Sequence, residues 1–128
     1  MRILVVDDDS LCVTVALRFL RSAGHTSEGC ADAESALQAL RAQPWDAAIL
    51  DYRMGPPDGL ELAQSILQYW PTVKLIGTSA FGTPKTRAAF LKYGGVAFLD
   101  KPYRLENLLR VLELVEAVPR HVRIPSDR

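Results

Sequence analysis

Residues 3–8 have the sequence ILVVDD, an apolar run that is followed directly by two aspartates, Asp7 and Asp8. A third aspartate, Asp51, directly follows a second apolar run at residues 47–50. If the two runs are neighbouring parallel strands, the three carboxylates meet at one edge of a sheet, where open α/β sheets bind their ligands. Like charges held that close repel each other, so the pattern predicts a cation that is shared among them.

Short apolar runs alternate with segments of helical period along the chain, which is typical of repeated βα units and a parallel sheet. Strands are predicted at residues 2–6, 26–30, 47–50, 73–78 and 96–99. Helices are predicted at residues 11–22, 33–42, 59–69, 84–92 and 105–118. Because right-handed crossovers place helices on both faces, the expected fold class is α/β. We expect a doubly wound, five-stranded parallel sheet with five helices in a three-layer sandwich.

The 128 residues are enough for one domain that buries a core without disulfides or a structural metal. We expect residues 1–118 to form that domain. Residues 119–128 carry two prolines and three arginines without periodicity, so they are expected to be a tail or the stub of a linker.

Charge and cysteine usage limit the classes of function. Fifteen basic and fifteen acidic residues give a formal net charge of zero, and no long run of either sign marks a nucleic-acid or membrane surface. Cys12 and Cys30 lack metal-ligand spacing, and two small buried side chains are favoured over a disulfide. We therefore expect a cytoplasmic protein that has no direct nucleic-acid partner and does not contact a membrane.

Two further polar side chains follow later strands of the predicted sheet. Ser79 follows the fourth strand, Lys101 follows the fifth, and the backbone just past Asp51 supplies carbonyl oxygens. Carboxylates and a carbonyl suit Mg²⁺, whereas a hydroxyl and an ammonium suit phosphoryl oxygens. The predicted sheet edge therefore combines a magnesium site, a phosphate site and a carboxylate that can accept a phosphoryl group.

The ordered set of these residues resembles the receiver domain of bacterial two-component response regulators, in the CheY-like superfamily. The residues that carry the resemblance are Asp7-Asp8, Asp51, Met54, Asp58-Gly59, Ser79-Ala80, Phe98 and Lys101-Pro102. No single motif is specific, but their order on five βα units is strongly specific. The resemblance implies a flavodoxin-like fold and a signalling phosphoacceptor rather than an enzyme. A histidine kinase or phosphotransfer protein would supply the phosphoryl group.

The resemblance also implies roles for the acidic residues. Asp51 would be the phosphorylated residue. Asp7, Asp8 and Asp51 would bind Mg²⁺ together with the main-chain carbonyl of Arg53, and Lys101 would contact the phosphate.

Ser79 and Phe98 match the pair that changes conformation in this family when phosphate is bound. Ala80 is small and would leave the bound phosphate accessible, and the Lys101–Pro102 peptide bond would be cis. Arg53 and Phe81 match positions that border the path of attacking water, so we expect them to set the lifetime of the phosphorylated state.

Several of these residues also have a purely structural interpretation. Ser79 could cap the turn after its strand, Phe98 could fill the core, and Lys101 could be an ordinary surface lysine. For Asp9 and Asp58, helix capping is the favoured interpretation.

The last predicted helix is more apolar than one sheet contact requires. Its expected core stripe is Leu105, Leu108, Leu109, Leu112 and Val115. Val111, Leu114 and Val118 widen the stripe to a second flank. This surplus suggests a homodimer or output partner on the face of the fourth helix, fifth strand and fifth helix, with the tail folding back over the flank as an equal alternative.

Two other functions compete with phosphoacceptance. The aspartates after the first strand also fit a haloacid-dehalogenase-like phosphatase with Asp7 as nucleophile, although Leu11 stands where a threonine-like residue is expected. A receiver-shaped interaction module that does not take phosphate is the second, because the loop after Met54 departs from the family's pattern.

Overall fold

The computed structural model describes residues 1–55 and 58–118, so the tail predicted at 119–128 lies outside the described residues. The strands are β1 (Arg2–Val6), β2 (Thr26–Cys30), β3 (Ala47–Asp51), β4 (Lys74–Ser79) and β5 (Ala97–Asp100). The helices are α1 (Ser10–Ser22), α2 (Ala33–Ala42), α3 (Gly59–Tyr69), α4 (Pro84–Lys92) and α5 (Leu105–Ala117). Each predicted element is present, with bounds that differ by at most one residue at either end.

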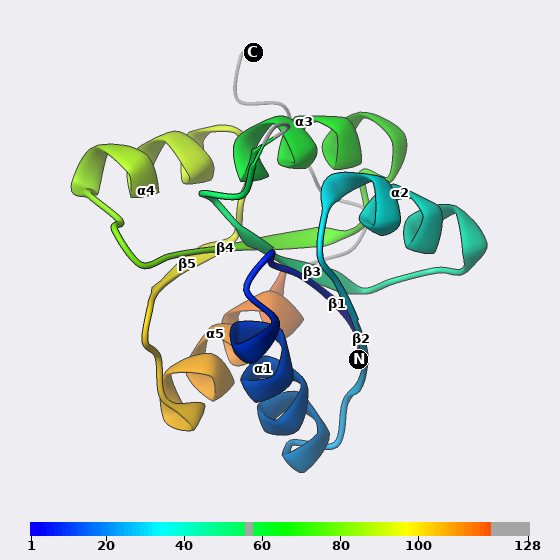
Figure 1. The fold of residues 1–128 in the computed structure, drawn as a ribbon, viewed down its shortest axis with the longest axis vertical. Helices are drawn as coiled ribbons and strands as arrows, with labels where there is room; N and C mark the ends of the chain where they lie inside the picture. The colour runs from blue at the N-terminus through cyan, green and yellow to red at the C-terminus, as the bar shows by residue number, and fades with distance from the viewer. Residues whose placement is uncertain (56–57, 119–128) are drawn as a thin grey trace.

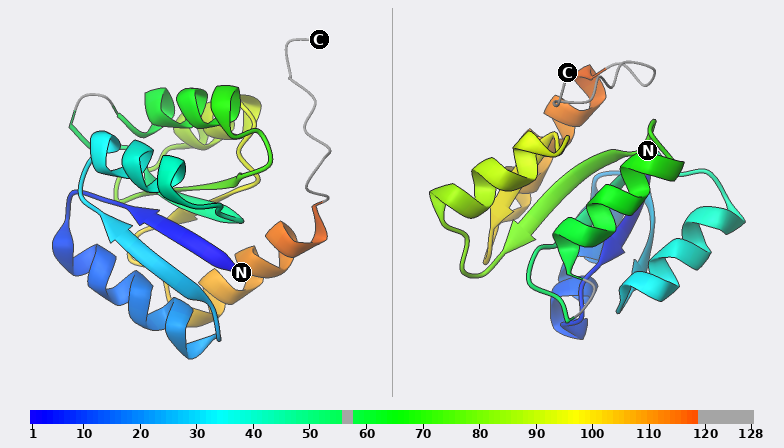
Figure 2. Two further views of the ribbon diagram at one scale, coloured as in Figure 1. Left: turned by 90° about the vertical axis from the view of Figure 1, so that its right-hand side faces the viewer. Right: turned by 90° about the horizontal axis from the view of Figure 1, so that it is seen from above.

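All strands pair in parallel in one sheet with the order β2-β1-β3-β4-β5. Helices α1 and α5 cover one face, and α2, α3 and α4 cover the other (Figures 1 and 2). This is the doubly wound, flavodoxin-like α/β sandwich that the sequence predicts. The chain runs from β1 to β2 on one side and then to β3 on the other, so the crevice between β1 and β3 is the topological switch point.

Alternate residues of the central strands pack against opposite helical layers, as the two-residue period of a strand requires. Leu4 and Leu50 belong to the core beneath α2, α3 and α4, whereas Ile3 and Ile49 belong to the core beneath α1 and α5. Strand β3 is buried at every position, while the polar edge strand β2 is largely exposed. The central strands are therefore fixed from both faces, and their ends are rigid platforms for a site.

Helix α5 corrects the predicted core stripe. Its buried residues are Leu108, Val111, Leu112 and Val115. Leu109, which the sequence analysis placed in the core, is 37% exposed, whereas Val111, which it placed on the flank, is buried. Both sets have helical spacing, and the angle at which α5 lies on the sheet selects between them.

A buried lysine joins β4 to the end of α5. The Lys74 Nζ donates a hydrogen bond of 2.9 Å to the main-chain carbonyl of Val115. Carbonyls in the last turn of a helix lack partners within the helix, and a cation there also opposes the negative end of the helix dipole. Lys74 therefore fixes the C-terminal turn of α5 against the sheet, a contact that the sequence analysis did not predict.

Cys12 and Cys30 are free, half-buried thiols, and burial raises the pKa of both. Among the described residues, no helix combines the length and the hydropathy that crossing a membrane requires.

Candidate functional site

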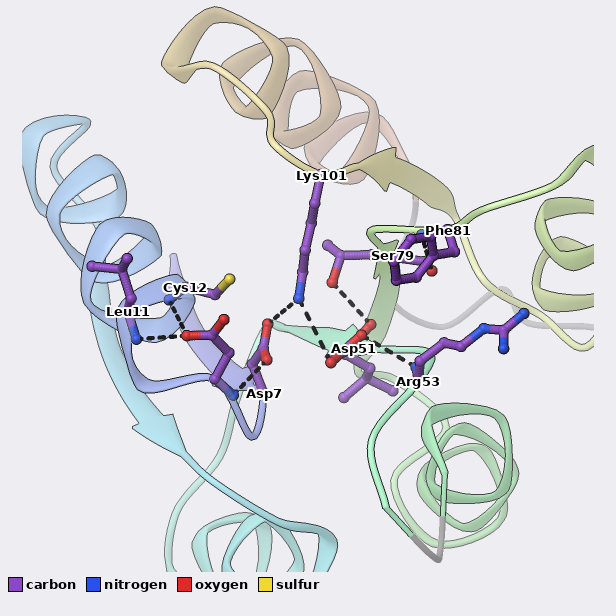
Figure 3. A network of polar contacts seen from close by, with 11 residues as sticks. Asp7, Leu11, Cys12, Asp51, Arg53, Ser79, Phe81 and Lys101 are labelled. Atoms are coloured by element: carbon purple, nitrogen blue, oxygen red, sulfur yellow. Dashed lines mark hydrogen bonds and ion pairs between the residues drawn. The ribbon is translucent and has the colours of Figure 1, made fainter.

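The C-terminal ends of four strands bring the predicted site residues together (Figure 3). Asp7 follows β1, Asp51 ends β3, Ser79 ends β4 and Lys101 follows β5. Main-chain hydrogen bonds continue the sheet beyond the strands. The Asp7 N–H donates to the Cys30 carbonyl at 3.0 Å, and the Lys101 N–H donates to the Ser79 carbonyl at 2.9 Å. The backbone that carries Asp7 and Lys101 is therefore held in register with the sheet.

Three carboxylates form a compact acidic cluster at this edge. Asp7, Asp8 and Asp51 each offer an oxygen, and these oxygens all lie within 4.8 Å of one another. Asp7 and Asp51 are buried, at 5% and 6% exposure, whereas Asp8 is exposed. Hard oxygen donors with one side open to water and phosphate are the ligand chemistry of Mg²⁺. The residues present therefore fit the magnesium ion that the sequence predicts.

Lys101 extends into this cluster from the end of β5, and its ammonium lies between Asp7 and Asp51. Its Nζ lies 2.6 Å from Asp7 Oδ2 and 3.6 Å from Asp51 Oδ2, and its side chain is only 13% exposed. Burial acts to lower the pKa of Lys101, but the hydrogen bond to Asp7 and the charges of both aspartates outweigh it, so the pKa is raised. The lysine therefore stays charged, and its interpretation as an ordinary surface lysine is wrong.

Asp51 is the carboxylate whose environment opposes ionisation. Burial is the largest cause of its raised pKa, and the neighbouring Asp7 adds to it. The Arg53 N–H, which donates to Asp51 Oδ1 at 3.2 Å, and the Lys101 charge act in the opposite direction without cancelling the rise. An arriving cation would relieve this cost, so the electrostatics favour cation binding at Asp51.

Ser79 is fully buried at the end of β4, beside the end of β3 that carries Asp51. The Ser79 Oγ accepts a hydrogen bond of 3.1 Å from the Phe81 N–H, so the predicted turn cap is confirmed. That bond uses an acceptor lone pair and leaves the hydroxyl proton available. Ala80 and Phe81 are exposed, and they form an open rim beside the serine.

Two aspartates cap helices, as predicted. The Asp9 carboxylate accepts hydrogen bonds from the N–H groups of Leu11 and Cys12 at 2.9 and 3.3 Å. Both bonds lower the pKa of Asp9, and the bond from Cys12 has the larger effect. The Asp9 N–H in turn donates to Asp7 Oδ1 at 2.9 Å, which orients the carboxylate of Asp7. Asp58 caps α3 in a capping box with Glu61.

Phe98 is in the core, as its structural interpretation predicts. It is 9% exposed and contacts Tyr52 and Phe90 edge to face, with ring centroids 6.4 and 5.8 Å away. Gly77 makes room for it, because a Cβ at Gly77 would lie 2.7 Å from Phe98 Cδ2. The Lys101–Pro102 peptide bond is cis, as the resemblance implies.

An apolar pocket of about 390 Å³ opens beside Lys101, between α1 and the start of α5. It is lined by Asp9, Leu11, Cys12, Val15, Ala80, Lys101, Pro102 and Tyr103. Leu11 is 69% exposed at this pocket, and burial raises the pKa of Tyr103 to about 12, so its hydroxyl stays neutral. The pocket is not predictable from the sequence, because its wall joins residues that lie far apart in the chain.

Comparisons with known proteins agree with this geometry. The family model of the response regulator receiver domain matches residues 3–113. The chain is 32% identical over 111 residues to the transcriptional regulatory protein ZraR of Escherichia coli (strain K12), covering 87% of this chain and 25% of ZraR. It is 34% identical over 127 residues to the response regulator MprA of Mycobacterium ulcerans (strain Agy99), covering 99% of this chain and 53% of MprA.

Among solved structures, the receiver domain of NtrX from Brucella abortus superimposes with a TM-score of 0.86 at 28% identity, covering 91% of this chain and 99% of that domain. The chain thus spans about a quarter to a half of the length of the curated relatives named above. Because ZraR is named a transcriptional regulatory protein, the expectation that this chain has no nucleic-acid partner is not supported.

Proposed function

This chain belongs to the family of response regulator receiver domains, and from that premise we propose that it accepts a phosphoryl group on Asp51 and changes conformation in response. The carrying observation is that the carboxylates of Asp7, Asp8 and Asp51 converge and that the Lys101 ammonium contacts both Asp7 and Asp51. We propose residues 1–118 as the receiver unit, a signalling phosphoacceptor whose chemistry is limited to its own phosphorylation and dephosphorylation.

The acidic residues prepare the acceptor. Asp7, Asp8, Asp51 and the Arg53 carbonyl would hold Mg²⁺, which supplies positive charge to the transferring phosphoryl oxygens when bound. The Asp51 carboxylate attacks phosphorus in line with the donor, a bond from Asp51 oxygen to phosphorus forms, and the bond from phosphorus to the donor imidazole breaks. The electron pair of the broken bond stays on the imidazole nitrogen, and Lys101 offsets charge on the phosphoryl oxygens.

Ser79 then reports the new charge to the rest of the domain. Its free hydroxyl proton can donate to a phosphoryl oxygen on Asp51, and that contact exists only in the phosphorylated state. A contact made in only one state shifts the balance between two conformations. Phe98 on β5 lies against Gly77, which is in β4 together with Ser79. Movement of the end of β4 therefore changes the space that Phe98 occupies.

The donor protein needs a surface beside Asp51, and the apolar pocket offers one. A histidine that reaches Asp51 places its own neighbours over the pocket edge, where Leu11, Val15 and Tyr103 lie. We propose this edge as the contact for a histidine kinase or phosphotransfer protein, because apolar side chains beside a polar centre are typical of recognition surfaces.

A second apolar surface is available for the output. Leu91, Tyr93, Leu109 and Leu114 are exposed apolar residues at the end of α4 and on α5. We propose the face of α4, β5 and α5 as the contact for a homodimer mate or an output domain.

Magnesium with acetyl phosphate or beryllofluoride tests the function. Amide NMR spectra should show shifts around Ser79 and Lys101 in the wild type and none in Asp51→Asn. A wild-type spectrum that stays unchanged at saturating beryllofluoride would contradict phosphoacceptance and favour the phosphate-independent interaction module.

A further inference from the structure

One arginine on α4 contacts two residues of β5 at once. The guanidinium carbon of Arg87 lies 5.4 Å from the ring centroid of Phe98. The Arg87 Nη2 also donates to both carboxylate oxygens of Asp100, at 3.0 and 2.8 Å. A single side chain therefore joins the helix to an aromatic ring and a carboxylate on the neighbouring strand.

The remaining sides of the Phe98 ring are already enclosed. The rings of Phe90 and Tyr52 lie against it, and two glycines lie close enough that a Cβ would crowd it. A Cβ at Gly77 would lie 2.7 Å from Phe98 Cδ2, and a Cβ at Gly82 would lie 3.2 Å from Phe98 Cε1. The guanidinium completes this enclosure on the side of α4, and the ring is left 9% exposed.

We propose that Arg87 is a positioning residue that holds Phe98 in its buried rotamer and so sets how readily the domain reaches its phosphorylated conformation. This inference rests on the proposed function, in which Phe98 changes conformation when Asp51 carries phosphate. Outward rotation of Phe98 requires the guanidinium to leave the ring and gives up their cation–π attraction. Arg87 therefore favours the resting state.

The pairing with Asp100 orients the guanidinium. Both side chains are substantially exposed, at 39% and 57%, so the ion pair itself contributes little to stability. Two bonds from one nitrogen nevertheless restrict where the guanidinium can lie, which keeps it over the ring. Asp100 directly precedes Lys101, whose N–H donates to the Ser79 carbonyl, so the contact is continuous with the phosphate site.

NMR of the magnesium-free, unphosphorylated protein tests the contact without any phosphate chemistry. Side-chain couplings and ring-to-ring cross-peaks should place Phe98 against Phe90 in the wild type. Arg87→Met keeps the aliphatic stem but removes the charge, and it should weaken those cross-peaks and average the Phe98 couplings. Lys85→Met is the matched control, because it removes one exposed positive charge from the same helix.

A beryllofluoride titration with magnesium then measures the effect on switching. Loss of a cation–π contact should lower the half-saturating concentration by about two- to fivefold in Arg87→Met. Asp100→Asn should shift it in the same direction by less, and Lys85→Met should leave it unchanged.

The outcomes separate this inference from the proposed function. A wild type that does not bind beryllofluoride contradicts the function, and with it the role of Arg87 in switching. If the wild type binds, but Arg87→Met shows the same half-saturation and the same Phe98 couplings, the inference about Arg87 is overturned and the function stands.

Discussion

The Lys101 ammonium lies 2.6 Å from a carboxylate oxygen of Asp7, although 94 positions separate the two residues in the chain. The same ammonium lies 3.6 Å from Asp51, so one lysine partly neutralises two buried acids. One positive charge does not balance the three carboxylates of the cluster, which leaves a net negative site at the end of the sheet. A divalent cation is the charge that this site lacks.

Magnesium should therefore raise the melting temperature of the domain. An ion that binds only the folded state stabilises that state by about 2.7 kcal/mol when the ion concentration is about 100 times its Kd. Asp7→Asn should reduce this increment because it removes a ligand, whereas Glu113→Gln, an exposed acid on α5, should leave it unchanged. Thermal melts with magnesium and with a chelator provide the measurement, and equal melting of the wild type in both would argue against the metal site.

The raised pKa of Asp51 predicts a pH-dependent cost of folding. The ordinary value of an aspartate is 3.8, and the folded-state pKa of Asp51 lies above it. The contribution of Asp51 to the free energy of unfolding is therefore most favourable when the pH is below its ordinary pKa. That contribution is lost as the pH rises through the folded-state pKa. In magnesium-free buffer, Asp51→Asn should unfold at a higher temperature than the wild type near pH 7, with a smaller difference near pH 4.

Denaturant or thermal unfolding at several pH values measures this difference. Glu113→Gln is again the control and should follow the wild type throughout. Parallel pH profiles for Asp51→Asn and the wild type would show that burial of Asp51 carries no ionisation cost.

If a donor protein contacts the apolar pocket edge, a mutation there should slow phosphorylation by the protein donor but not by a small-molecule donor. Leu11→Asp places a charge on the surface that the donor protein should cover, so transfer from the histidine kinase that phosphorylates the wild type should slow about tenfold or more, the effect of losing 1.4 kcal/mol or more of contact energy. Phosphorylation by acetyl phosphate should be unchanged. Leu114→Asp is the matched control on α5, and an equal loss in both variants would place the kinase elsewhere.

Arg53 and Phe81 provide a test of the phosphorylated lifetime. Arg53 is exposed next to Asp51, and Phe81 is 75% exposed on the rim beyond Ser79, so both side chains are placed to limit the approach of water. Arg53→Asn and Phe81→Ala should change the dephosphorylation rate of acyl phosphate on Asp51 severalfold. Arg18→Asn on α1 and Tyr69→Ala on α3, both at exposed sites, should leave the rate unchanged. Unchanged rates in Arg53→Asn and Phe81→Ala would dismiss the assignment.

The sequence predicted the strands and the acidic cluster because both follow from local patterns. Apolar runs that end in Asp7 and Asp51 mark buried strands and their ends, and a parallel sheet necessarily brings those ends to one edge. The helix caps at Asp9 and Asp58 could likewise be predicted, because both aspartates stand directly before segments of helical period.

Contacts that depend on how the helices pack on the sheet could not be predicted from the sequence. The choice between Leu109 and Val111 on α5 depends on the angle of the helix on the sheet, and either choice has the same spacing. The Lys74 contact with the end of α5 and the Arg87 contact with Phe98 join residues whose proximity only the assembled layers create. The sequence pattern therefore predicts the aspartates and Lys101 of the site, but not the contacts that Lys74 and Arg87 make between layers.

Mapping the phosphorylated residue tests the central claim most directly. The protein is incubated with acetyl phosphate and magnesium, digested, and analysed by mass spectrometry, with Asp51→Asn in parallel. We expect one phosphoryl group on Asp51 in the wild type and none in the variant. Phosphate on Asp7 instead would contradict the account and favour a phosphatase that uses Asp7 as its nucleophile.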